Sequence, residues 1–129
     1  MSKILVIEDS KPVSTFLRRC LEKAGYEVEE WLPRSELDVP HHIKTSAPDL
    51  ILTDYFMPGL SGAAVARHAF AAPRRVPVIV LTALREEESI ARLLQLGVRL
   101  VLNKPIEPEV LLQAVRDALA GSTKLEPLP

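Results

Sequence analysis

Five side chains that could do chemistry together lie at the ends of short apolar runs in the sequence. They offer three carboxylates, one hydroxyl and one ammonium group, and they are Glu8, Asp9, Asp54, Thr82 and Lys104. If the runs are parallel strands, their carboxyl ends meet at one edge of a sheet, which is where such folds bind ligands. The sequence therefore predicts that these five groups converge on one site.

The three carboxylates predict a metal site. Carboxylates crowded at one point repel one another, and a cation among them relieves that repulsion. Ligands that are all oxygen favour a hard ion, and Mg²⁺ typically takes one or two carboxylates while keeping room for water and a phosphate. We expect Asp9 and Asp54 to bind the ion directly and Glu8 to reach it through water.

The same group of residues suits phosphoryl transfer. A carboxylate can act as a nucleophile toward phosphorus, and the transfer needs mainly positioning and neutralisation of negative charge. The ammonium group of Lys104 and the metal would supply that neutralisation, and the hydroxyl of Thr82 can donate to a phosphoryl oxygen. We interpret the arrangement as a site for an acyl phosphate on Asp54.

The elements that must position these residues can be read from the hydrophobic pattern. Four runs rich in Ile, Val and Leu are too short to be helices: residues 4–7, 50–52, 78–81 and 100–102. Their continuous hydrophobicity favours strands that are buried on both faces of a parallel sheet. Residues 26–31 alternate instead and predict a half-exposed edge strand.

Helical patterns separate these strands. Apolar residues spaced three and four apart mark one buried face after each strand, for example at Ile90, Leu93 and Leu94. Pro33 and Pro40 limit the second helix to residues 40–46, because an interior proline costs about 3 kcal/mol. Five strand–helix repeats with right-handed crossovers predict a doubly wound α/β sheet with helices on both faces.

The composition limits the classes of function. The chain has 129 residues, a formal net charge of −1 and one cysteine, Cys20. This length suits one domain, the charge balance gives no reason to expect nucleic-acid binding, and one cysteine excludes an internal disulfide framework. No apolar run approaches the roughly 20 residues that cross a bilayer, and the N-terminus lacks a signal-peptide pattern. We expect a cytoplasmic domain that contacts neither membrane nor nucleic acid directly.

Several motifs resemble the receiver domain of bacterial response regulators. Their order in the sequence is Glu8-Asp9, Asp54 with Met57-Pro58-Gly59 and Gly62, Thr82-Ala83, and Lys104-Pro105. Each motif is common by itself, but all of them in this order at matching strand ends are specific. The resemblance assigns residues 1–120 to one receiver domain and leaves residues 121–129 as a tail or the start of a linker. It also implies a (βα)5 flavodoxin-like fold, a five-stranded parallel sheet of strand order 2-1-3-4-5.

The family implies a function for these residues. A sensor histidine kinase or a histidine phosphotransfer protein would phosphorylate Asp54, and the domain would catalyse this step on itself without being a conventional enzyme. The metal, Mg²⁺ or alternatively Mn²⁺, would also take the backbone carbonyl of Phe56. Thr82, Ala83 and Lys104 would bind the phosphoryl group, and a cis peptide bond before Pro105 would aim the lysine at it.

The family also implies an output surface, and the sequence departs from the family near it. The surface comprises the fourth helix, fifth strand and fifth helix, around residues 90–95, 98–102 and 111–118. It would switch an attached output domain or a downstream protein, and it is compatible with a homodimer. Val101 stands where relatives commonly carry an aromatic switch residue. Phe56 and Leu84 flank the phosphoryl site with apolar side chains that cannot orient water, which predicts a long-lived phosphoryl group.

Three alternatives compete with a phosphorylation-controlled switch. A phosphorylation-independent receiver-like interaction module is favoured by Val101 and opposed by the intact acidic cluster. A Mg²⁺-dependent phosphatase needs a second acid two residues after the nucleophile, where this chain has Phe56. A flavin carrier is disfavoured because Glu8 and Asp9 would repel the flavin phosphate.

Overall fold

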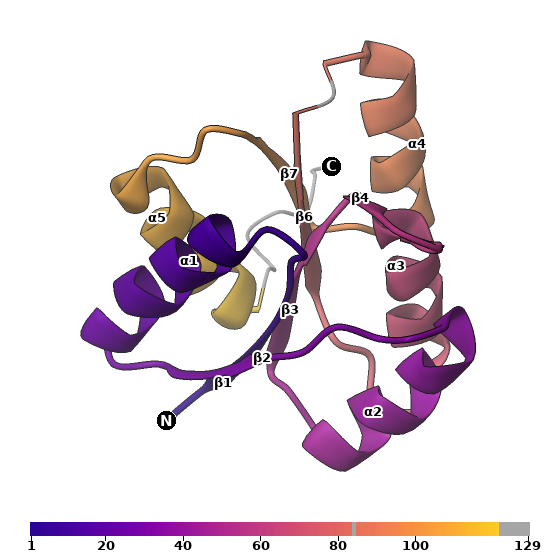
Figure 1. Cartoon of the computed structure of the whole chain (residues 1–129), viewed down its shortest axis with the longest axis horizontal. Coiled ribbons are helices and arrows are strands. Elements are labelled where there is room, and N and C mark those ends of the chain that lie inside the picture. Colours follow the sequence, from indigo (N-terminus) through magenta and orange to yellow (C-terminus); the bar gives the residue numbers. More distant parts are fainter. Residues whose placement is uncertain (84, 122–129) are drawn as a thin grey trace.

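The computed structural model, which describes residues 1–83 and 85–121, is built around a five-stranded parallel sheet (Figure 1). Its strands are β1 (Lys3–Ile7), β2 (Glu27–Glu30), β3 (Leu50–Asp54), β6 (Val78–Thr82) and β7 (Leu100–Asn103). They lie in the order β2-β1-β3-β6-β7, which is 2-1-3-4-5 when the strands of this sheet are numbered along the chain. The predicted fold class and strand order are therefore confirmed.

Five α-helices cover both faces of this sheet. They are α1 (Lys11–Lys23), α2 (Val39–Ser46), α3 (Gly62–Ala71), α4 (Glu87–Leu96) and α5 (Pro108–Leu119), and a short 3-10 helix, η1 (Glu36–Asp38), precedes α2. Helices α1 and α5 lie on one side of the sheet, and α2, α3 and α4 lie on the other (Figure 1). Helix α2 begins one residue earlier than the predicted second helix, which was limited to residues 40–46. Pro40 lies in its first turn, where a missing N–H is tolerated.

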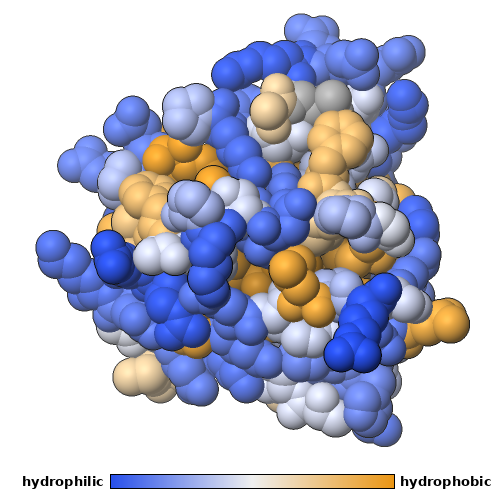
Figure 2. Space-filling model, in the orientation of Figure 1, coloured by the Kyte–Doolittle hydropathy of each residue, from blue (hydrophilic) through white to orange (hydrophobic). Residues whose placement is uncertain are grey.

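Alternate residues of the central strands enter two separate cores. Ile4 and Val6 pack with α1 and α5, whereas Leu5 and Ile7 pack with α2, α3 and α4. This alternation follows from the two-residue period of a strand whose two faces are both covered. The face in Figure 2 is largely hydrophilic, and its apolar side chains form small separate groups.

The helices begin and end where local chemistry requires. Ser10 and Ser61 each accept a hydrogen bond from a backbone N–H in the first turn of α1 and α3. Gly97 ends α4 with a φ of 110°, a left-handed conformation that costs glycine little.

Within residues 1–83 and 85–121, no helix has the length and apolar character that crossing a membrane requires.

Two expectations about apolar residues were wrong. Leu100 was predicted to lie in a strand that is buried on both faces of the sheet. It is 38% exposed because β7 is an edge strand. Leu94 was placed on the buried face of its helix, but it is 47% exposed whereas Leu93 is 3% exposed. Helix α4 packs on α3 and on this edge strand, so only a narrow stripe of its surface is buried.

Other differences concern short or undescribed segments. A two-stranded antiparallel pair, β4 (Phe56–Met57) and β5 (Leu60–Ser61), was not predicted because two-residue strands carry no recognisable pattern. Leu84 and residues 122–129 of the predicted tail lie outside the described residues.

Candidate functional site

The predicted site residues lie together at the carboxyl edge of the sheet. Asp54 and Thr82 are the last residues of β3 and β6, Glu8 and Asp9 follow β1, and Lys104 follows β7. The register of the sheet pairs Asp54 with Leu81 and Thr82 with Asn103, so these strands end nearly level with one another. Parallel pairing thus brings residues that are far apart in the sequence to one edge.

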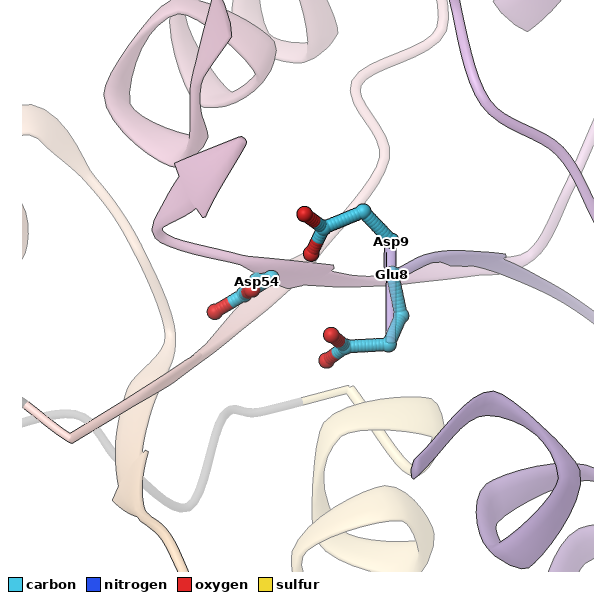
Figure 3. Close-up of side chains that lie close together, drawn as sticks. All are labelled: Glu8, Asp9 and Asp54. Carbon is cyan, nitrogen blue, oxygen red and sulfur yellow. The ribbon is translucent and has the colours of Figure 1, made fainter. Parts of the chain in front are cut away.

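Three carboxylates form the centre of the site. Glu8, Asp9 and Asp54 each have a carboxylate oxygen within 4.8 Å of those of the other two. Figure 3 shows the Glu8 and Asp9 side chains extending from the end of β1 toward the side on which Asp54 lies. Glu8 and Asp54 are buried, whereas Asp9 is exposed. An ion could therefore enter from the Asp9 side without displacing the buried carboxylates.

Lys104 connects the two buried carboxylates. Its Nζ lies 3.1 Å from Glu8 Oε1 and 3.3 Å from Asp54 Oδ1. The Glu8 side chain is fully buried in the described structure, and that of Lys104 is 24% exposed. The other Glu8 oxygen, Oε2, accepts a hydrogen bond from the backbone N–H of Ser10 at 3.1 Å. One ammonium group therefore neutralises part of the negative charge of two carboxylates.

Burial and the neighbouring charges shift two pKa values in the site. Burial raises the pKa of Glu8, and the nearby Asp54 charge adds to this rise, while the Ser10 N–H and Lys104 oppose it. Burial alone would lower the pKa of Lys104, but its ion pairs with Glu8 and Asp54 outweigh that effect and raise it. Lys104 is therefore firmly cationic, and the acidic cluster still carries more charge than one lysine can balance.

These residues fit a hard divalent cation. The donor set consists entirely of carboxylate oxygens, which suits Mg²⁺ or Mn²⁺ and not a soft metal. Glu8 Oε1 is buried, and its contact among the described residues is the ion pair with Lys104 at 3.1 Å. That oxygen retains an acceptor position that a water molecule on a hydrated ion could fill.

The backbone around Asp54 supplies contacts that the sequence pattern did not predict. The N–H of Tyr55 donates to Asp54 Oδ1 at 2.9 Å, and the N–H of Gly62 donates to the carbonyl of Tyr55 at 2.8 Å. A Cβ on Gly62 would lie 2.8 Å from the backbone oxygen of Asp54, so α3 approaches β3 too closely for any other residue. The motif glycine was the only sequence signal of this contact.

The remaining predicted residues lie around this centre. Thr82 is buried, with 1% of its surface exposed, and its carbonyl accepts the N–H of Lys104 at 2.9 Å. Ala83 is exposed, and the Lys104–Pro105 peptide bond is cis. The Phe56 side chain is 61% exposed and packs edge-on against Tyr55.

Two further residues near the site bear on how it could signal. Val101 is half-buried and packs into the core that α2, α3 and α4 share, with no aromatic ring at this position. Trp31 lines a hollow of about 180 Å³ together with Glu8 and Asp9, and its ring stacks on that of His42 at 3.8 Å between centroids. This tryptophan, which is the only one in the chain, therefore lies where it can report on the acidic cluster.

Comparisons with known proteins agree with this geometry. A family model described as the response regulator receiver domain matches residues 4–116. The Phosphate regulon transcriptional regulatory protein PhoB of Rhizobium meliloti (strain 1021) is 34% identical over 121 residues, covering 92% of this chain and 52% of PhoB. PhoB of Escherichia coli (strain K12) is 32% identical over 117 residues, covering 88% of this chain and 50% of that protein. The chain thus spans about half the length of these relatives.

Solved structures show the same fold. The BeF3-activated N-terminal receiver domain of RstA from Klebsiella pneumoniae aligns with a TM-score of 0.80 and 27% identity, covering 92% of this chain and 98% of that one. The receiver domain of the Francisella response regulator 1452 aligns with a TM-score of 0.81 and 26% identity, covering 93% of this chain and 98% of that one.

Proposed function

Because the chain belongs to the response regulator receiver domain family, as its motifs predicted, we propose that it is a phosphoacceptor domain of a two-component system. Asp54 accepts a phosphoryl group from a sensor histidine kinase or a histidine phosphotransfer protein. The observation that carries this proposal is the position of Lys104, whose Nζ lies within 3.3 Å of both the acceptor Asp54 and the neighbouring Glu8.

The carboxylate of Asp54 is arranged for attack by one of its oxygens. Oδ1 accepts the Tyr55 N–H and lies next to Lys104, which leaves Oδ2 as the nucleophile. A bond forms between Oδ2 and phosphorus while the phosphorus–nitrogen bond to the donor histidine breaks, and the imidazole leaves with the electron pair of that bond. The Lys104 ammonium, the Thr82 hydroxyl and the Ala83 N–H then bind the phosphoryl oxygens.

Asp9, Asp54 and the backbone carbonyl of Phe56 would hold Mg²⁺ or Mn²⁺, with Glu8 acting through water. When bound, this ion supplies neutralisation of the negative charge that develops on the transferred group. The support within the structure is the carboxylate cluster of Glu8, Asp9 and Asp54, whose charge Lys104 balances only in part.

Phe56 and Leu84 set the lifetime of the phosphoryl group in this proposal. Each stands two residues after a phosphoryl-site residue, Asp54 and Thr82, and each carries an apolar side chain. Neither can hold a water molecule by a hydrogen bond for in-line attack on phosphorus. The domain therefore dephosphorylates itself slowly.

The output surface consists of α4, β7 and α5. Leu94, Leu100 and Val110 expose 47%, 38% and 50% of their surfaces there. Large apolar side chains that stay exposed favour contact with another protein surface. We propose that this surface acts on an output domain or a downstream protein, with a homodimer as one form of that contact.

The proposal also covers the extent and location of the domain. Residues 1–120 form the receiver domain, and residues 121–129 form a tail or the start of a linker. The domain acts in the cytoplasm.

A phosphorylation-independent interaction module is the second candidate, and Val101 is the observation that favours it. An isopropyl group at this half-buried position cannot make the rotation that an aromatic ring makes. The two candidates differ in whether the site responds to a phosphoryl analogue, so one binding experiment distinguishes them.

That experiment follows Trp31 fluorescence and the ¹⁹F NMR signal of beryllofluoride. Adding Mg²⁺ should change the fluorescence saturably, because Trp31 shares a hollow with Glu8 and Asp9. Beryllofluoride with Mg²⁺ should then give a bound ¹⁹F signal that the Asp54→Asn variant loses. A saturable Mg²⁺ response without any bound beryllofluoride would favour the phosphorylation-independent module.

A further inference from the structure

A polar hollow lies at the opposite edge of the sheet from Asp54. Its volume is about 320 Å³, and its walls include Asp49, Pro77 and Arg99, which precede β3, β6 and β7. The end of α5 closes one side of it through Leu119 and Gly121. None of the residues proposed for phosphoryl transfer lines this hollow.

Arginine dominates the charge of this hollow. Arg74, Arg75 and Arg99 line it, and Asp49 is the one acidic residue among the described lining residues. Both oxygens of Asp49 are already used: Oδ1 accepts from Arg74 Nη2 at 2.8 Å, and Oδ2 accepts the N–H of Lys3 at 2.7 Å. Asp49 therefore balances Arg74, and among the described lining residues no further acidic side chain balances the positive charges of Arg75 and Arg99.

Arg99 has an unused donor that points to a missing partner. Its Nη1 is buried and has no hydrogen-bond partner among residues 1–83 and 85–121. Leaving a buried donor of a charged group unpaired is costly. Because Arg99 also lines the hollow, an oxyanion bound there would lie next to this charged group and offset part of that cost. Arg75 is held nearby, with its guanidinium carbon 5.5 Å from the centre of the Phe70 ring.

We propose that this hollow binds a small oxyanion, namely a phosphate group that is free or part of a small phosphomonoester. A guanidinium presents paired N–H donors in a planar fork that matches two oxygens of a phosphate group. Arg99 supplies one guanidinium from the lining of the hollow, and Arg75 supplies a second positive charge. Binding is independent of Mg²⁺, because the acidic cluster at the other edge of the sheet takes no part in it.

The test measures phosphate binding to the whole chain by isothermal titration calorimetry in chloride buffer with EDTA. Without a metal, the carboxylates of Glu8, Asp9 and Asp54 repel phosphate, so binding there does not interfere. Inorganic phosphate and glycerol 3-phosphate are titrated separately. We expect one saturable site for at least one of the two compounds. A lower dissociation constant for glycerol 3-phosphate than for inorganic phosphate would identify the esterified form as the ligand.

Matched variants locate the site. Arg99→Gln and Arg75→Gln should each weaken binding about tenfold or more, whereas Arg19→Gln, the same change of charge on an exposed position of α1, should leave affinity unchanged. Asp54→Asn should also bind normally, which separates this inference from the proposed phosphoacceptor function. Arg75 is exposed, so its variant remains informative even if Arg99→Gln lowers stability. Absence of saturable binding, or equal affinity in the three arginine variants, would overturn the proposal.

Discussion

At the scale of single residues, the site depends on one ammonium group that lies between two buried carboxylates. Lys104 contacts Glu8 and Asp54, and its pKa is raised because these ion pairs outweigh the effect of burial. Glu8 has a raised pKa for the opposite reason, since burial and the Asp54 charge disfavour its ionised form. The unliganded site is thus held together by a partial balance of charge.

Lys104→Met should destabilise the metal-free protein, because it leaves the carboxylate of Glu8 buried without a cation. We expect a loss of about 2 kcal/mol in the free energy of unfolding by urea, and a clearly smaller loss in a Glu8→Gln background. Equal losses in the two backgrounds would show that Lys104 and Glu8 are not coupled.

Phe56→Asn and Leu84→Asn should shorten the life of the phosphoryl group. Each change introduces an amide that can orient water toward phosphorus, and we expect dephosphorylation to quicken by about tenfold, a change of about 1.4 kcal/mol in the barrier. The rate is measured by intact mass after excess phosphodonor is removed. Phe56→Leu serves as a control that keeps the position apolar, and unchanged rates in both asparagine variants would contradict this role.

At the scale of elements, the site is stiffened by the contact between β3 and α3. Gly62 lets the start of α3 approach the backbone of Asp54, and the Gly62 N–H fixes the carbonyl of Tyr55. On the other side of the sheet, Arg18 of α1 forms an ion pair with Glu30 of β2 and attaches that helix to the edge strand. The first contact fixes α3 against β3, and the second fixes α1 against β2.

Gly62→Ala should move Asp54 as well as destabilise the fold. The new Cβ would lie 2.8 Å from a backbone oxygen, so β3 and α3 must separate. We expect a loss of about 1–3 kcal/mol in unfolding free energy. We also expect weaker Mg²⁺ binding, which is measured by titration with Trp31 fluorescence as the signal. Ala71→Gly, at the far end of α3, is the control: it should cost up to about 1 kcal/mol and leave Mg²⁺ binding intact. Normal Mg²⁺ affinity in Gly62→Ala would refute the coupling.

Glu30→Gln should change how stability depends on pH. The hydrogen bond from Arg18 lowers the pKa of Glu30 below its usual 4.5, so the stabilisation is present above that value and is lost as the pH falls through the lowered pKa. We expect the variant to be less stable by about 0.5–1 kcal/mol near neutrality, because the pair is partly exposed. This difference should shrink as the pH falls below 4.5 and vanish below the lowered pKa of Glu30. A difference that stays constant with pH would contradict this explanation.

The sequence predicted most of the site because each of its polar members ends a strand whose hydrophobic run is unmistakable. Glu8, Asp54, Thr82 and Lys104 are placed by that rule alone. The Tyr55 N–H and the close approach of Gly62 are backbone contacts, which side-chain patterns do not encode. Leu100 was misplaced because hydrophobicity does not distinguish a central strand from an edge strand.

At the scale of the whole molecule, the proposed functions lie on different edges and faces of one sheet. The carboxyl edge holds the acidic cluster, the opposite edge holds the arginine hollow, and α4, β7 and α5 expose apolar residues. The chain spans about half the length of each of the two PhoB relatives, and its proposed output partner is either an output domain or a separate downstream protein. The proposed signalling depends on an acyl phosphate on Asp54.

Intact mass spectrometry after incubation with acetyl phosphate and Mg²⁺ detects this acyl phosphate. We predict one added phosphoryl group, which is absent without Mg²⁺, absent in Asp54→Asn, and removed by hydroxylamine as an acyl phosphate would be. A phosphoryl group that persists in Asp54→Asn would contradict the assignment of the acceptor. No added mass, together with no bound beryllofluoride, would contradict the phosphoacceptor function itself.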